Sequence, residues 1–172
     1  FPDDLGYYAI KKYRYEGAPS ANDSNHNLLL FRDPSVDGLQ TGHTDAMGYG
    51  MVATARREVP GLGQSGAAPG SAPSLGSRRL LSIVLGAASD NARAIESQKL
   101  LNWGYSAFDA VKLFDANQTV VAPAVWKGKA PTVSLGQARP IVVVVPAGSS
   151  GRIDTQVVRP EPLIAPLIKG QS

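Results

Sequence analysis

Three segments with the apolar patterns of β-strands constrain what this chain can fold into more than any other feature. Residues 36–41 have the composition of a strand, and residues 48–56 alternate Tyr, Met and Ala with Gly, Val and Thr. Residues 79–86 are apolar at nearly every position, as in a strand that is buried on both faces. We therefore predict three strands, with the third in the centre of its sheet.

A long helix is predicted after these strands. Residues 89–108 carry apolar side chains near helical spacing, and Ser89 or Asp90 can cap the first turn. Residues 60–77, between the second and third strands, consist almost entirely of Gly, Ala, Pro, Ser and Gln. Such a tract cannot bury enough apolar surface to offset the entropy of ordering it, so we predict a flexible insertion without a catalytic role.

The N-terminal region has a less regular pattern. Aromatic side chains alternate with charged ones toward the end of residues 1–17, which predicts a strand with one buried face. Residues 18–27 are rich in Ser, Asn, Asp and Pro and are predicted to form a loop.

A second, β-rich unit is predicted from residue 111 onward, because short apolar runs alternate there with turn residues. We therefore divide the chain into residues 1–110 and 111–172. The predicted strands of the second unit are residues 119–126, 131–135, 141–145 and 153–158. Residues 166–172 end directly after an apolar segment with no closing strand, so we expect this unit to be truncated.

The charge and composition exclude several functional classes. The net charge is +3 and the pI is near 9.3, but the basic residues form scattered pairs, which are typical of solvated surface, so we expect no nucleic-acid partner. The chain has no cysteine, and its two histidines, His26 and His43, show no ligand spacing, so we expect neither a metal site nor a cofactor. No window approaches the roughly 18 apolar residues of a membrane span, so membrane association is expected only through residues outside this chain.

Three motifs carry the functional information. Residues 36–45 read Val-Asp-Gly-Leu-Gln-Thr-Gly-His-Thr-Asp, residues 96–104 read Glu-Ser-Gln-Lys-Leu-Leu-Asn-Trp-Gly, and residues 125–128 read Val-Trp-Lys-Gly. In this order they resemble the Lys-Thr-Gly box, a later helix and the start of the second domain of low-molecular-mass penicillin-binding D-alanyl-D-alanine carboxypeptidases, which are S11-like serine peptidases. The resemblance implies an α+β fold, in which part of an antiparallel sheet with a packed helix is followed by a small β-rich domain.

The residue types in the box also suit peptide binding on physical grounds alone. A strand beside a cleft can pair its backbone with an extended peptide, and Gly42 lets that peptide approach closely. Thr41 offers a hydroxyl donor that suits a terminal carboxylate. By resemblance, the backbone N–H of His43 is an oxyanion-hole donor for acyl transfer. Arg93, at a position that the family also fills with arginine, either influences a substrate carboxylate or forms a surface or interdomain ion pair with Glu96 or a nearby acid.

Gln40 stands where the family has lysine, and the family's nucleophile is not found. A glutamine amide donates hydrogen bonds but carries no charge, so its presence is expected to cost about 2–4 kcal/mol of transition-state stabilisation. The family's catalytic serine lies in Ser-x-x-Lys, and no serine of this chain has a lysine three residues later. Two Ser-x-Asn strings begin at Ser20 and Ser89; we interpret the first as coincidence and the second as a helix cap. We therefore predict that this chain alone is inactive.

The favoured hypothesis is the C-terminal half of a catalytic domain plus part of the following domain. The implied whole protein trims peptidoglycan stem pentapeptides through an acyl-serine intermediate, is acylated by β-lactams, and acts in the periplasm or at the outer face of the cytoplasmic membrane. Its expected partner is the upstream half of the same catalytic domain. Two alternatives stay open: a non-catalytic peptidoglycan-binding or scaffolding piece, and a β-lactamase-like hydrolase.

Overall fold

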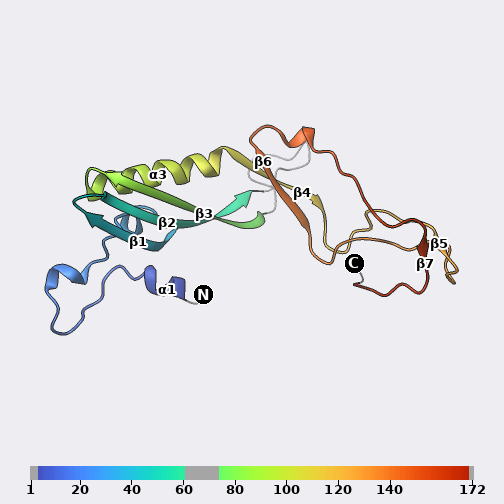
Figure 1. The fold of residues 1–172 in the computed structure, drawn as a ribbon, viewed down its shortest axis with the longest axis horizontal. Coiled ribbons are helices and arrows are strands. Elements are labelled where there is room, and N and C mark those ends of the chain that lie inside the picture. The colour runs from blue at the N-terminus through green and yellow to red at the C-terminus, as the bar shows by residue number, and fades with distance from the viewer. Residues whose placement is uncertain (1–3, 61–73, 171–172) are drawn as a thin grey trace. The chain divides into compact units, whose positions relative to one another are not determined.

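The computed structural model describes residues 4–60 and 74–170 (Figure 1). It divides into two compact units, Phe1–Phe108 and Asp109–Ser172. Most of the predicted flexible insertion, residues 60–77, lies outside the described residues. None of the helices in the described part combines the length and the apolar character that crossing a bilayer requires.

The first unit is built on a three-stranded antiparallel sheet in the order β1-β2-β3. Its strands are β1 (Val36–Thr44), β2 (Gly48–Pro60) and β3 (Ser74–Ala87). A turn at residues 45–47 joins β1 to β2 and sets a register in which His43 lies opposite Tyr49. The strands predicted at residues 36–41 and 48–56 are confirmed, and both extend further than predicted.

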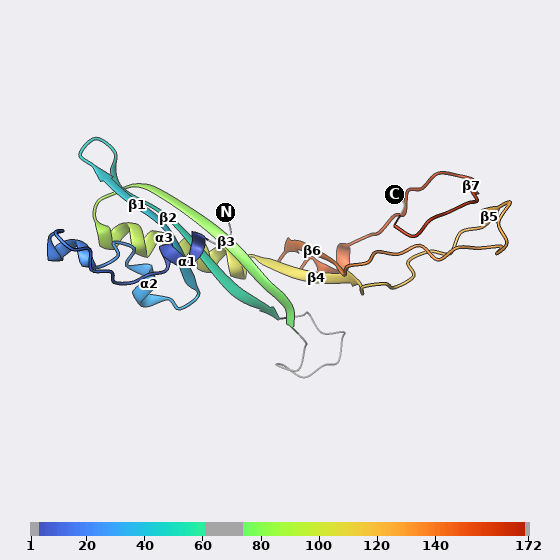
Figure 2. The ribbon, with the colours of Figure 1, turned by 90° about the horizontal axis from the view of Figure 1, so that it is seen from below.

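The long helix α3 (Asp90–Ser106) lies along one face of this sheet, as both ribbon views show (Figures 1 and 2). The Ser89 hydroxyl accepts a hydrogen bond of 3.1 Å from the Ala92 N–H, so Ser89 is the predicted helix cap. The helix and the short helix α2 (Leu29–Arg32) enclose the core between them and the sheet. The buried core consists of Leu29, Leu30, Val36, Met51, Ala53, Ala55, Ala94 and Leu101.

Two predictions for the first unit are wrong. Among the described strands β3 pairs only with β2, so it is an edge strand rather than the central one, and Leu81, Ile83 and Leu85 on it are more than half exposed. The described part of residues 1–17 contains helix α1 (Leu5–Tyr8) and no strand. The alternating aromatic side chains there are exposed rather than buried, so the alternation does not mark the buried face of a strand.

The predicted loop, residues 18–27, includes only the single turn η2 (Ser20–Asp23). Backbone hydrogen bonds close residues 11–25 into a compact loop, from the Asn25 N–H to the Lys11 oxygen and from the Tyr13 N–H to the Asp23 oxygen. A methyl group added at Gly38 would lie 3.1 Å from the Tyr8 β-carbon, which shows how closely α1 packs on β1.

The second unit has short strands and many turns. β4 (Phe108–Phe114) pairs with β6 (Ile141–Pro146), and β5 (Val125–Trp126) pairs in parallel with β7 (Leu163–Ile164). A short turn of helix, η3 (Ser150–Arg152), lies between β6 and β7.

Of the four strands predicted for this unit, only residues 141–145 form a strand of similar length. The predictions at residues 119–126 and 131–135 reduce to β5 and two isolated bridges, Val121–Leu135 and Ala124–Thr132, and residues 153–158 form no strand. Prolines at positions 123 and 131 lack the N–H that a continuous ladder needs, which explains the interruption.

The packing of α3 on the sheet predicts a contrast between two adjacent leucines. Leu101 is 1% exposed and Leu100 is 46% exposed. Leu101→Ala should lower the free energy of unfolding by about 2–5 kcal/mol because it leaves a cavity under the sheet, whereas Leu100→Ala should cost less than about 1 kcal/mol. Urea unfolding of both variants measures this, and equal losses would contradict the orientation of α3.

Candidate functional site

The box, residues 40–43, lies on the edge strand β1, beside an open cavity of about 740 Å³. Leu39, Gln40 and Thr41 line the cavity from the strand. β1 pairs with β2 on one side and with no other described strand, so its outer edge can accept an extended peptide. A methyl group added at Gly42 would meet no atom within 4 Å, which leaves open space beside the box.

The far wall of the cavity comes from the N-terminal region. Helix α1, the loop of residues 11–25 and the residues next to this loop contribute aromatic and amide side chains that line the same cavity as residues 39–41. The lining residues of this wall are Tyr7, Ile10, Tyr13, Tyr15, Ala18, Asn22, Asp23, Ser24, Asn25 and His26. Most of these belong to the segments that the sequence pattern predicted as a strand with one buried face and as a loop.

His43 combines an exposed side chain with a place in the strand backbone. Its imidazole stacks on the Tyr49 ring across the hairpin, with 4.0 Å between ring centroids and 29° between planes. In an antiparallel ladder alternate backbone N–H groups point away from the paired strand. The oxyanion-hole role of the His43 backbone N–H stays a prediction, and the side chain packs on the Tyr49 ring.

Arg93 links α3 to β1, which contains the box, and to its neighbour β2. Its side chain is buried, with a guanidinium that donates hydrogen bonds to the carbonyl oxygens of Gly42, at 2.7 Å, and Gly50, at 3.1 Å. It also pairs with Asp90 one turn earlier on the helix and lies over the Tyr49 ring, 5.5 Å from its centroid. The pair with Asp90 is an ion pair with a nearby acid, which was one of the two hypotheses for Arg93. The hydrogen bonds to Gly42 and Gly50 add a third role, in which the side chain positions the backbone of the box.

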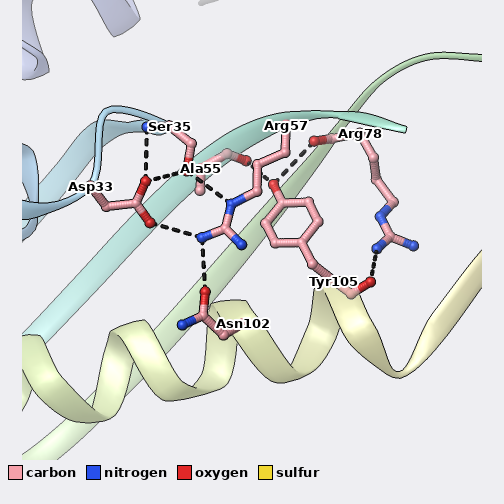
Figure 3. A network of polar contacts seen from close by, with 7 residues as sticks. All are labelled: Asp33, Ser35, Ala55, Arg57, Arg78, Asn102 and Tyr105. Carbon is pink, nitrogen blue, oxygen red and sulfur yellow. Dashed lines mark hydrogen bonds and ion pairs between the residues drawn. The ribbon is translucent and has the colours of Figure 1, made fainter. Parts of the chain in front are cut away.

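A second polar network holds the start of β1 (Figure 3). Asp33 accepts hydrogen bonds from the Ser35 N–H and hydroxyl, at 2.9 and 2.6 Å, and pairs with Arg57 of β2 at 2.8 Å. The Arg57 guanidinium also donates to the Asn102 amide oxygen on α3, at 2.9 Å. This network connects the segment before β1, the neighbouring strand and the helix.

Tyr105 continues the network toward β3. Its hydroxyl lies 2.7 Å from the Ala55 oxygen and 3.1 Å from the Arg78 oxygen, and the guanidinium groups of Arg57 and Arg78 lie 4.4 and 5.2 Å from its ring centroid. Burial raises the pKa of Tyr105, so its hydroxyl stays protonated and can donate. These arginines belong to the scattered pairs predicted to be solvated surface, and that prediction is wrong for Arg57 and Arg78, because each is partly buried among protein acceptors.

Asp37, just before the box, is held by a two-point ion pair. Its carboxylate accepts hydrogen bonds from Arg79 at 2.6 and 2.7 Å and from the Thr54 hydroxyl at 2.5 Å. Burial opposes ionisation of Asp37, but the hydrogen bonds from Arg79 and Thr54 and the charge of Arg79 outweigh it and lower the pKa of Asp37 below its ordinary value. The pKa of Asp33 is lowered in the same way by Ser35 and Arg57 against the effect of burial.

The structure thus brings Gln40 and Thr41 to one cavity, places Gly42 next to it, and buries Arg93 behind the strand. The sequence reasoning missed the contributions of Asn22, Asn25 and His26, since nothing in a loop composition shows which strand the loop will face. No group of three or more His, Cys, Asp or Glu side chains within residues 4–60 and 74–170 is arranged to hold a metal ion.

Comparisons with known proteins give a family for the second unit and relatives for nearly the whole chain. Residues 108–172 match the family model described as penicillin-binding protein 5, C-terminal domain. The chain is 29% identical over 99% of its length to D-alanyl-D-alanine carboxypeptidase DacA of Haemophilus influenzae and 35% identical over 95% of its length to D-alanyl-D-alanine carboxypeptidase DacC of Escherichia coli. It spans 39% and 37% of the length of these two relatives.

A solved structure supports the same assignment. Penicillin-binding protein 5 from Haemophilus influenzae matches 99% of this chain and 44% of its own chain, with a TM-score of 0.70 and 29% identity. The α+β architecture, with an antiparallel sheet and a helix on one face, is therefore that of a penicillin-binding peptidase. The chain is thus similar over nearly its whole length to D-alanyl-D-alanine carboxypeptidases and to penicillin-binding protein 5, and this confirms the resemblance found in the sequence.

The ion pair at the start of the box strand predicts a dependence of stability on acid. A carboxylate with a lowered pKa in the folded state stabilises the fold above its unfolded pKa of about 4, and this contribution is lost as the pH falls through the lower, folded-state value. Asp37→Asn should therefore lower the free energy of unfolding at neutral pH and make its decline below about pH 4 shallower.

Denaturant unfolding at a series of pH values measures this effect. Asp45→Asn, in the exposed turn after the box, is the matched control and should keep the steeper decline. An Asp37→Asn variant whose stability declines in acid as steeply as that of the unaltered protein would contradict the assigned pair.

Proposed function

We propose that this chain forms one wall of the substrate cleft of a serine-type D-alanyl-D-alanine carboxypeptidase that trims peptidoglycan stem pentapeptides. The observation that carries the proposal is the position of Gln40 and Thr41 on an unpaired strand edge that lines a cavity. The names of the relatives, which align with nearly the whole chain, supply the reaction class. The whole protein is proposed to work in the periplasm or at the outer face of the cytoplasmic membrane, where peptidoglycan is found.

The edge of β1 supplies binding and polarisation in this mechanism. An extended stem peptide lies along the strand as an added β-strand, with Thr41 donating a hydrogen bond to its terminal carboxylate. The serine oxygen, from polypeptide outside this chain, attacks the carbonyl carbon of the penultimate D-alanine. The negative charge that develops on the carbonyl oxygen is stabilised by the backbone N–H of His43. The terminal D-alanine leaves with its amine, and water then hydrolyses the acyl-serine.

β-Lactams react with the same cleft in the first half of this sequence. The serine opens the lactam ring and remains acylated, and the carboxylate of the drug takes the place of the peptide carboxylate beside Thr41. This proposal accounts for a penicillin-binding family without requiring a metal or a cofactor in the chemistry.

Gln40 weakens the site relative to a lysine box. A charge-assisted hydrogen bond is about twice as strong as a neutral one, so an amide at this position stabilises the oxyanion and the carboxylate less. Acylation of the serine in this cleft is therefore proposed to be slower than in a relative whose box has lysine. This chain, which lacks the serine, is proposed to be inactive.

Arg93 acts as a positioning residue in this proposal. Since its guanidinium holds the carbonyl oxygens of Gly42 and Gly50, it fixes the strand that presents the His43 N–H. Its burial on the helix side, at 4% exposure of the side chain, favours this role over contact with the substrate carboxylate.

A penicillin-labelling experiment tests the proposal. The whole protein should form a covalent adduct with a fluorescent penicillin and release D-alanine from a stem-peptide analogue, whereas the 172-residue chain should form no adduct. Adduct formation by the chain alone contradicts the missing nucleophile. A whole protein that forms no adduct favours the scaffolding alternative, and rapid cephalosporin turnover without D-alanine release favours the β-lactamase-like alternative.

Restoring the charge tests the argument about Gln40. In the whole protein, Gln40→Lys should raise the rate of penicillin acylation by about 10²–10³, because the ammonium group stabilises the developing negative charge. Gln137→Lys, at an exposed position of the second unit, is the matched control and should leave the rate unchanged. An unchanged rate for Gln40→Lys contradicts the charge argument while leaving the family assignment intact.

A further inference from the structure

The cavity beside the box has an unusual distribution of charge. Its strand wall carries Gln40 and Thr41, which donate hydrogen bonds but are neutral. On the opposite wall, the carboxylate of Asp23 is paired with Arg14 at 3.0 Å. Among the described residues that line the cavity, His26 is the sole side chain that can carry a positive charge.

The backbone on both sides of His26 is fixed by asparagine side chains. The Asn25 amide nitrogen donates to the carbonyl oxygens of Tyr8 and Ile10, at 3.2 and 3.0 Å, and its amide oxygen accepts from the Asn27 N–H at 2.9 Å. Asn27 is fully buried, and its amide oxygen accepts from the Leu29 N–H at the start of α2, at 3.0 Å. His26 therefore projects from a tethered segment rather than from a free loop, as a binding residue requires.

We propose that His26 binds the terminal carboxylate of the peptide from the wall opposite Thr41, and so supplies part of the positive charge that Gln40 does not. This inference rests on the proposed function, since it assigns the ligand to the same cleft. An imidazole N–H donates to a carboxylate whether or not the ring is charged, and the charged ring adds electrostatic attraction. The two walls then hold one anionic group between a hydroxyl and an imidazole.

The chain offers a direct spectroscopic test, because His26 and His43 are its two histidines. The probe is diacetyl-L-lysyl-D-alanyl-D-alanine, compared with the same peptide carrying a C-terminal amide. Proton NMR of the 172-residue chain follows the imidazole signals during titration, and a His26→Gln spectrum assigns them. The acid should shift the His26 signals in a saturable way, at about tenfold lower concentration than the amide.

Substitutions at position 26 provide a second test that does not depend on assigning the imidazole NMR signals. His26→Gln should weaken binding of the peptide acid by about tenfold, as measured on backbone amide signals of residues 40–43, and His26→Arg should preserve or strengthen it. Lys12→Gln is the matched control, since Lys12 lies on the loop of residues 11–25 next to His26 but does not line the cavity. It should leave binding of the peptide acid unchanged, and preserved signal dispersion in each variant shows that the fold is intact.

The failure of this inference is distinguishable from the failure of the proposed function. Equal shifts of the His26 signals with acid and amide, an equally strong shift with acetate, no shift at all, or unweakened binding by His26→Gln would each overturn the role of His26. None of these results bears on D-alanine release by the whole protein, which tests the proposed function by itself.

Discussion

The guanidinium of Arg93 is the contact on which the geometry of the site depends. It comes from the first turn of α3 and reaches the carbonyl oxygens of Gly42 on β1 and Gly50 on β2. A buried arginine needs partners for its charge, and here two carbonyl groups and Asp90 pair with its two terminal nitrogens, while its Nε has no hydrogen-bond partner. Removing a partner of a buried charge typically costs about 3–5 kcal/mol, so the helix, both strands and the box are energetically coupled through this one side chain.

The arginines of the first unit are used for structure, and this shapes the chemistry of the cleft. Arg57, Arg78 and Arg79 bind carboxylate, hydroxyl or carbonyl oxygens of the fold, and none of them lines the cavity. Apart from the His26 imidazole, the hydrogen-bond donors among the described residues that line the cavity are therefore neutral. A box with glutamine in place of lysine fits this pattern, because the site then depends on placement more than on fixed charge.

The parts of the fold and of the candidate site that depend on local interactions could be predicted from the sequence, and the parts that depend on contacts between distant residues could not. The strands at residues 36–41 and 48–56 were predictable because their alternation reflects a real buried face, and the helix cap at Ser89 because capping is a local contact. The edge position of β3 was not, since its apolar outer face looks like that of a covered strand.

The box was found through its motif, but Gly42 and Arg93 are 51 residues apart, and nothing in composition shows that one binds the other. His26 was missed because its position depends on tethers from Asn25 to Tyr8 and Ile10.

The most direct measurement of the central claim is amide hydrogen exchange along β1 in an Arg93→Met variant, with Lys99→Met on the same helix as the matched control, since Lys99 is exposed and pairs with Glu96. If Arg93 positions the box, the amides of residues 40–44 that pair with β2 should exchange at least about tenfold faster in Arg93→Met, while those in the middle of β3 keep their protection. The Lys99→Met variant should match the unaltered chain throughout. Unchanged exchange in β1, or an equal increase across the whole first unit, would contradict the account.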